Sequence, residues 1–244
     1  MTNSCSDLIK ECTKKKYITI TDRGNTAIDL ALQLVKEHRT KTTILIPDQG
    51  GWIHFAKAPP RFGLQVKKLK TNYGIINPED CKDAAAILYS AYAGYFAQQD
   101  IKEIYQEAKK NNVLVILDIS ASYTATEIDA DILVASCRKI IGAESGGFIA
   151  TDFAIEEIQG CTQELQEKLQ NAPARLKELL ATQKKVKEDL KDEEIFHKDR
   201  LGIAVAVKTS QKVLEYTKEH NYETIRCPKN IKIEADAVVI DLYE

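Results

Sequence analysis

Short runs of apolar and β-branched residues recur through the first 154 positions of the chain, and helical patterns separate several of them. In the pattern over 25–38, Ile28, Leu32 and Val35 fall on one face, and the segment 100–112 repeats this spacing. Nearly continuous apolar strands that alternate with amphipathic helices are typical of a parallel sheet covered on both faces. The pattern therefore predicts a three-layer α/β/α domain with a mostly parallel sheet of about seven strands, at residues 17–21, 42–47, 64–70, 85–90, 113–120, 131–136 and 146–151.

The pattern changes after residue 154. Residues 155–195 are rich in Glu, Lys, Gln and Leu and contain no strand-like run, which predicts one or two long helices with a solvated charged face. Pro173 marks either a break or a helix start. A strand near 202–208, a helix near 211–220 and a final apolar run follow. We therefore predict a large domain over 1–154, a helical linker over 155–195 and a small C-terminal α+β domain over 196–244, which is too small to be stable undocked.

Composition narrows the class of protein. Of 244 residues, 44% are hydrophobic and 29% are charged, which is ordinary for a globular chain. The net charge of −2 gives no field that would recruit nucleic acid or a membrane surface, and no apolar run could span a bilayer. The six cysteines show no CxxC pair, which favours reduced thiols over a disulfide framework or a zinc site. We expect a cytoplasmic protein without membrane association or general nucleic-acid binding.

The turn after the first strand suits a phosphate group. Gly24 permits a tight turn, and Asn25 and Thr26 place backbone N–H groups at the start of the first clear helix. An ordinary helix cap by Asn25 or Thr26 explains the same residues. The chain contains neither GxGxxG nor GxxxxGK[ST], which argues against a dinucleotide-binding fold and against a P-loop nucleoside triphosphatase.

An acid and a lysine follow two later strands. Asp118 ends the apolar run 113–118, and Lys139 comes three residues after Ser136 at the end of the next strand. A buried carboxylate requires a positive partner, although Lys139 taken alone reads as a surface cation. Pyridoxal phosphate needs a phosphate site, a lysine for a Schiff base and an acid for its ring nitrogen. The adjacent Arg138 would favour the neutral amine of the lysine.

These segments resemble the fold type I pyridoxal-phosphate enzymes, the aspartate aminotransferase superfamily, over residues 17–152. The resemblance is carried by "RGNTAIDLAL", "AGYFAQQDIKEIYQEAKKNNVLVILDIS", "DILVASCRK" and "ESGGFIATD". It implies that Lys139 is the catalytic Schiff-base lysine and that Asp118 pairs with the ring nitrogen. It also implies that Ser136 and the turn residues Gly24, Asn25 and Thr26 bind the phosphate, and that the site forms in a homodimer.

The resemblance also guides the search for further cofactor and substrate contacts. The aromatic residue that stacks on the cofactor ring should follow the strand at 42–47, where Gln49, Trp52 and His54 are candidates and Trp52 is favoured. For a substrate carboxylate, the candidate arginines are Arg23 and Arg226. Family members are usually longer, and the turn at 91–93 lacks the asparagine that many of them use.

The function that follows is a pyridoxal-phosphate-dependent transferase, aminotransferase-like, acting on an amino acid or an aminated small molecule. A lyase, a desulfurase or a tRNA-linked amino-acid synthase stays open as the reaction branch, with Cys161 as a possible persulfide carrier. A second hypothesis is a catalytically reduced scaffold that binds the cofactor or a partner protein. A third, a binding domain for another phosphorylated ligand, leaves Lys139 unexplained. Cys137, next to Arg138, is either a reactive thiol or a buried filler.

Overall fold

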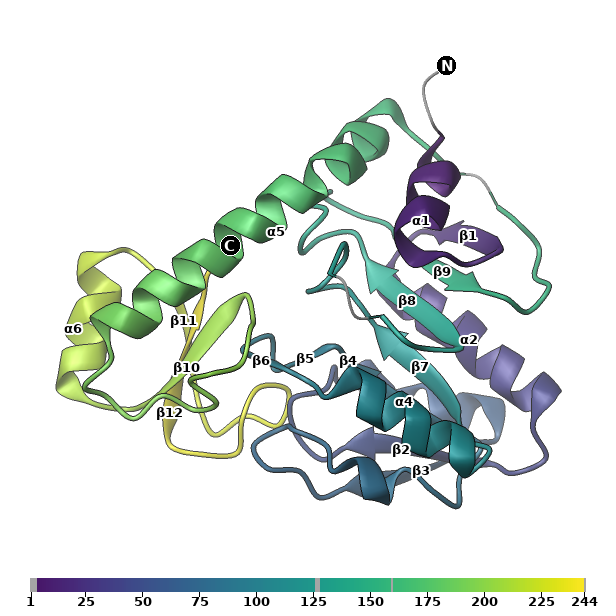
Figure 1. Cartoon of the computed structure of the whole chain (residues 1–244), viewed down its shortest axis with the longest axis horizontal. Coiled ribbons are helices and arrows are strands. Elements are labelled where there is room, and N and C mark those ends of the chain that lie inside the picture. The colour runs from purple at the N-terminus through teal and green to yellow at the C-terminus, as the bar shows by residue number, and fades with distance from the viewer. Residues whose placement is uncertain (1–3, 126–127, 159, 244) are drawn as a thin grey trace.

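A seven-stranded sheet forms the core of the larger, N-terminal part of the protein (Figure 1). The structure, a computed structural model, describes residues 4–125, 128–158 and 160–243; the outer ends of the predicted domains, residues 1–3 and 244, lie outside these ranges. The predicted mostly parallel sheet is confirmed, because only β9 runs antiparallel to its neighbours β1 and β8. In spatial order the strands are β1 (Tyr17–Thr21), β9 (Gly147–Thr151), β8 (Ile132–Ser136), β7 (Leu114–Asp118), β4 (Ala86–Ser90), β2 (Thr43–Pro47) and β3 (Gln65–Leu69).

Helices cover both faces of this sheet, which confirms the three-layer α/β/α prediction. The helix α2 (Gly24–His38) buries its apolar stripe, including Leu32 and Val35, against one face. On the other face lie α1 (Cys5–Thr13), α4 (Ile101–Lys110) and the first half of α5 (Gln163–Asp189). The remaining short elements are α3 (His54–Lys57), η1 (Pro59–Phe62), η2 (Pro78–Asp80) and the hairpin β5 (Tyr92–Ala93) with β6 (Ala97–Gln98).

The segment predicted as one or two helices contains a single helix of 27 residues, α5. Thr162 caps its first turn through its side chain, and Pro173 lies inside the helix without ending it. The buried stripe of α5 repeats every three to four residues, so the charged residues are left on the outer face. Figure 1 shows α5 running from the large sheet to the C-terminal unit. Within the described residues, no helix is both long and apolar enough to cross a membrane.

The C-terminal part is an α+β unit, as predicted. Its three strands are antiparallel in the order β10 (Ala204–Lys208), β12 (Ala237–Asp241), β11 (Glu223–Arg226), and α6 (Gln211–Glu219) packs on them through Val213. The strand β11 was not predicted, because its largely exposed sequence "ETIR" has no apolar run. The other face of the small sheet packs on the β5–β6 hairpin, where Ala204 and Val239 share a core with Phe96.

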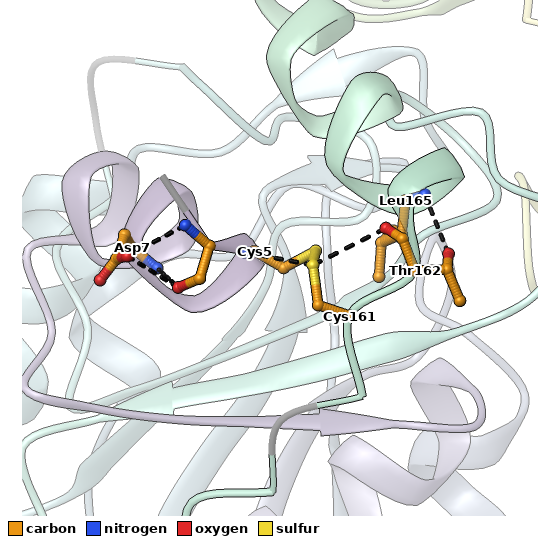
Figure 2. The surroundings of a disulfide bond; sticks show 6 residues. Cys5, Asp7, Cys161, Thr162 and Leu165 are labelled. Atoms are coloured by element: carbon orange, nitrogen blue, oxygen red, sulfur yellow. Dashed lines mark hydrogen bonds between the residues drawn. A yellow bond between two sulfur atoms is a disulfide. The ribbon is translucent and has the colours of Figure 1, made fainter. Parts of the chain in front are cut away.

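A disulfide corrects the expectation that all cysteines are reduced. Cys5 in α1 is bonded to Cys161, which lies just before α5 and 156 positions further along the chain (Figure 2). The two cysteines meet because α1 and the first turns of α5 pack on the same face of the sheet. Because the two cysteines are so far apart in the sequence, the local spacing of cysteines does not predict that they pair. Among the described residues the free thiols are Cys12, Cys81, Cys137 and Cys227.

Candidate active site

The carboxyl ends of β7 and β8 carry the predicted acid and serine. Asp118 is the last residue of β7 and Ser136 is the last of β8, and the two strands are parallel neighbours. The Asp118 carboxylate accepts a hydrogen bond from the Ser120 backbone N–H at 2.9 Å and another from its hydroxyl. The Ser120 hydroxyl oxygen in turn accepts the Ser136 N–H at 2.8 Å. The side chain of Ser120 therefore joins the two strand ends.

Asp118 is buried, with 6% of its surface exposed. Burial raises the pKa of its carboxyl above the ordinary value of 3.8, while hydrogen bonds from Ser120 and Ser90 act in the opposite direction. A buried acid held by neutral donors alone suits a cationic partner. Asp118 is thus placed to pair with positive charge in the space beyond the strand ends.

Lys139 lies in the turn that follows β8. Hydrogen bonds from Ala143 N to Cys137 O, at 2.9 Å, and from Ile140 N to Ser120 O, at 3.4 Å, close this turn. The Lys139 ammonium lies 4.1 Å from the centroid of the Tyr243 ring and 5.5 Å from that of Tyr95. Both distances are within the range of cation–π attraction. The turn and the two rings therefore hold the lysine beside the end of β8.

The start of α2 approaches the same strand ends. No side chain caps this helix, although the Thr26 N–H donates to the Arg23 carbonyl at 3.1 Å. The dipole at such a helix start favours an anion. A side chain at Gly24 would place its Cβ only 2.9 Å from the Cβ of Ser136, so glycine is required by the close approach of the two loops. Thr26 does not line the space beyond the strands; its hydroxyl donates to the Asp22 carboxylate.

Of the three candidates for ring stacking, Trp52 alone lines this space. Its indole N–H donates to the side-chain oxygen of Asn25 at 2.9 Å, and 40% of its surface is exposed. The buried Gln49 instead accepts the Glu234 N–H at 2.7 Å. His54 contacts Asp29 of α2 at 2.9 Å. The geometry leaves Trp52 as the aromatic residue on this side.

These residues surround one cavity of about 640 Å³. Six of the seven predicted site residues line it together, while Thr26 lies outside: Gly24, Asn25, Trp52, Asp118, Ser136 and Lys139. Arg23 also lines the cavity, whereas Arg226 does not. The volume is typical of sites for small molecules and cofactors. The cavity thus combines a buried acid, an amine and the start of a helix that no side chain caps.

Comparison with known proteins identifies the fold. No protein-family model and no curated protein sequence matches the chain. Among solved structures, a NifS-like protein aligns over 97% of this chain and 80% of its own, with a TM-score of 0.74 and 14% identity. The subgroup IV aspartate aminotransferase from Thermus thermophilus aligns over 97% and 82%, with a TM-score of 0.74 and 16% identity. A cysteine desulfurase from Thermococcus onnurineus NA1 aligns over 97% and 78%, with a TM-score of 0.69 and 11% identity.

The chain has the fold of these solved proteins, which is fold type I in the classification of pyridoxal-phosphate enzymes. The predicted fold is therefore confirmed, in a chain of 244 residues that spans about four fifths of the solved proteins named above. On this type I fold, the cavity lies where the carboxyl ends of the parallel strands β7 and β8 face the C-terminal unit.

The wall opposite β7 and β8 was not predicted. It is formed by the C-terminal unit, which contributes Lys232, Asp241 and Tyr243, together with Tyr95 from the β5–β6 turn. The signal for Asp241 was present in the sequence, since "AVVID" ends an apolar strand with an acid in the same way as "LVILD" does at Asp118. The signal for Lys232 is weaker, because it rests only on the isoleucines on either side of it.

No cysteine lines the cavity among the described residues. Cys137, next to the site turn, is buried, and burial raises the pKa of its thiol to about 12. Cys161 is held in the disulfide with Cys5. Cys137 therefore behaves as a buried filler, because a thiol with a raised pKa is a poor nucleophile at neutral pH.

Proposed function

We propose that the protein is a pyridoxal-phosphate-dependent transferase of the aminotransferase type, acting on an amino acid or an aminated small molecule. One observation carries the proposal: Asp118 and Lys139 extend from adjacent parallel strands into a single cavity that also receives the uncapped start of α2. Acid, amine and anion site are the three groups that the cofactor requires. The type I fold, which aminotransferases share, supports the same proposal.

The residues present fit pyridoxal phosphate. The first-turn N–H groups of α2, beside Gly24 and Ser136, would hold its phosphate. The Asp118 carboxylate would hold a proton against the ring nitrogen, and Trp52 offers a flat indole for the ring. Bound here, the cofactor would supply an aldehyde for covalent attachment and a ring that withdraws electrons.

Side chains of the protein would carry out the proton transfer, hold the acid in place and bind the substrate. Lys139 Nζ would form the covalent bond to the cofactor aldehyde. Once the substrate's amine had displaced it, the released Lys139 amine would take a proton from the substrate's α-carbon and return it. Ser120 would keep the Asp118 carboxylate in place through its two hydrogen bonds. Arg23 and Arg138, which line the cavity, are the cations available to an acidic group of the substrate.

The cysteines favour amino transfer over desulfuration. Solved proteins of this fold include cysteine desulfurases as well as aminotransferases. A persulfide carrier has to reach the substrate sulfur, yet among the described residues no cysteine lines the cavity. The four free cysteines are wholly or partly buried, and burial raises the pKa of each thiol. This makes a persulfide mechanism the weaker candidate.

Two measurements test the proposal: the covalent attachment of pyridoxal phosphate and the conversion of an amino acid. Protein incubated with pyridoxal phosphate and then reduced with borohydride should carry the cofactor on the peptide that contains Lys139, as found by mass spectrometry. Lys139→Ala should lose this label while keeping its circular-dichroism spectrum. The loaded protein should then release a keto acid from at least one amino acid and no sulfide from cysteine. Sedimentation should give a homodimer, which we propose as the assembly.

Each failure has a distinct meaning. A wild-type protein that never acquires the label refutes the cofactor. A label that forms without keto-acid release from any amino donor supports the reduced scaffold instead. Release of sulfide from cysteine would assign the protein to the desulfurase branch.

A further inference from the structure

Arg175 lies near the middle of α5, where the C-terminal end of the chain passes beside this helix (Figure 1). Its guanidinium donates a hydrogen bond from Nη2 to the Tyr243 carbonyl oxygen at 2.9 Å. The Arg175 Nε is buried and has no hydrogen-bond partner among the described residues. A buried donor without a partner costs free energy, so a gain in stability does not by itself explain why the guanidinium lies here.

The same guanidinium lies against the turn that carries Lys139. A side chain at Gly142 would place its Cβ 3.1 Å from Arg175 Nη1 and 3.5 Å from Cζ. Gly142 also has a φ of +72°, a conformation that favours glycine. The Ala143 N–H closes the turn by donating to Cys137 O at 2.9 Å. Arg175 therefore packs directly on the backbone of this turn.

The turn and the C-terminal end of the chain meet at the cavity. The Lys139 ammonium lies 4.1 Å from the centroid of the Tyr243 ring, within the range of cation–π attraction. The turn follows β8 of the large sheet, whereas Tyr243 follows β12 of the C-terminal sheet. Because the amine and the ring come from separate sheets, the local structure of either one does not fix the distance between them. Arg175 contacts the backbone on both sides of this contact.

We propose that Arg175 is a positioning residue for the Lys139 amine: by holding the Lys139 turn and Tyr243 together, it fixes the amine over the tyrosine ring. This inference rests on the proposed function for its catalytic meaning, because an amine held in one place reacts faster than one that moves among several positions. The contacts themselves belong to this chain alone, and they can be tested without cofactor.

The first experiment measures where the Lys139 amine lies relative to the Tyr243 ring in cofactor-free protein. Lysine side chains are dimethylated with isotope-labelled formaldehyde and a borane reductant, which reach Lys139 through the cavity, and the methyl resonances are followed by NMR. Methyl groups above an aromatic ring are shifted upfield by the ring current. This shift depends on where the methyl groups lie over the ring and not on which other groups the amine contacts. Lys139→Arg identifies the resonance, and Tyr243→Leu gives its position without the ring.

Arg175→Met should remove most of the shift that the Tyr243 ring causes, because methionine keeps the apolar stem and loses the hydrogen bond to the carbonyl. Arg175→Lys keeps a donor that can reach this carbonyl and should retain most of the shift. Lys177→Met makes the same change of charge at an exposed position of α5 and should leave the shift unchanged. Arg175→Gln, whose side chain is too short to reach the carbonyl, is a second loss variant that decides the question if Arg175→Met does not fold.

The second experiment measures the covalent attachment of pyridoxal phosphate. Arg175→Met should attach the cofactor to Lys139 more slowly by about tenfold or more, because a misplaced reacting group reacts more slowly. Arg175→Lys should react at close to the wild-type rate. Arg175→Met combined with Tyr243→Leu should be no slower than Tyr243→Leu alone, because two residues that act through one contact do not have additive effects. A role in general stability would instead give additive losses.

Retention of the full shift in Arg175→Met would overturn the proposal, as would a loss of the shift in Lys177→Met, which would assign the effect to α5 as a whole. Additive effects of Arg175→Met and Tyr243→Leu on attachment would also contradict it. If the shift follows the expected order but even wild type never acquires the cofactor, the proposed function fails and the positioning of Lys139 stands. If wild type acquires the cofactor but Arg175→Met keeps the shift, only the role of Arg175 fails.

Discussion

In the absence of a cationic partner, the charged Asp118 carboxylate lowers the free energy of unfolding of the protein. Because the pKa of its carboxyl is raised in the folded state, the folded protein binds more protons than the unfolded chain between the two pKa values. The free energy of unfolding therefore falls as the pH rises from about 3.8 through the folded pKa. Asp118→Asn removes this penalty, so the cofactor-free variant should be more stable than wild type at neutral pH. The gain should vanish in strong acid, as measured by urea unfolding across that range.

The same substitution should weaken the attachment of pyridoxal phosphate. A hydrogen bond to a charged group contributes about 1.5–3 kcal/mol, so we expect roughly tenfold to hundredfold weaker loading. Asp152→Asn is the matched control, because Asp152 pairs with Lys15 and does not line the cavity. The prediction is contradicted if Asp118→Asn is less stable than wild type and still attaches pyridoxal phosphate normally. Asp118 would then stabilise the fold without contributing to cofactor binding.

At the residue scale, one wall of the cavity could be predicted and the other could not. Asp118 and Lys139 were found because each follows an apolar strand in a parallel sheet, and parallel strands end at one edge. Asp241 ends an equally apolar strand, but β12 belongs to a separate antiparallel sheet. Its approach to Lys139 depends on how the C-terminal unit docks, which no local pattern determines.

The disulfide between α1 and the segment before α5 closes a loop of 156 positions (Figure 2). A crosslink across a long loop restricts the unfolded chain, and such bonds typically contribute about 2–4 kcal/mol. Cys161→Ser should lower the free energy of unfolding by about this amount. Reductant should bring wild type to the stability of the variant and leave the variant itself unchanged, as followed by urea unfolding.

Alkylation gives an independent check on this bond. In denaturant without reductant, four of the six cysteines should react, because Cys5 and Cys161 are bonded to each other. All six should react after reduction. Reaction of all six before reduction, together with a stability that ignores reductant, would contradict the disulfide.

Elements with a strong period were predictable, and those defined by distant contacts were not. The strands of the large sheet and α2 carry continuous or periodic apolar residues, and they appear close to the predicted bounds. The sequence did not decide between one and two helices over 155–195, because a proline such as Pro173 inside a helix destabilises it. The buried stripe that continues on both sides of it keeps α5 in one piece.

At the scale of the whole molecule, α5 connects the two walls of the cavity through one buried amide. The Gln183 side chain donates to Phe96 O at 3.3 Å and to Ala204 O at 3.0 Å, and it accepts the Gly202 N–H at 3.0 Å. It therefore joins α5 to the β5–β6 turn and to the C-terminal sheet. The turn supplies Tyr95 to the cavity, β12 supplies Asp241, and the loop before β12 supplies Lys232.

Gln183→Leu preserves the volume and loses all three hydrogen bonds. Each buried backbone group left without its partner costs about 1 kcal/mol or more, so the free energy of unfolding should fall by about 3 kcal/mol. Gln170→Leu makes the same chemical change on the exposed side of α5 and should shift stability by no more than about 0.5 kcal/mol. Loading with pyridoxal phosphate should also weaken in Gln183→Leu alone, because the wall that positions Lys139 is then less firmly docked. Equal unfolding midpoints for the two variants would mean that the C-terminal unit is held by its apolar contacts with the β5–β6 hairpin and not by this amide.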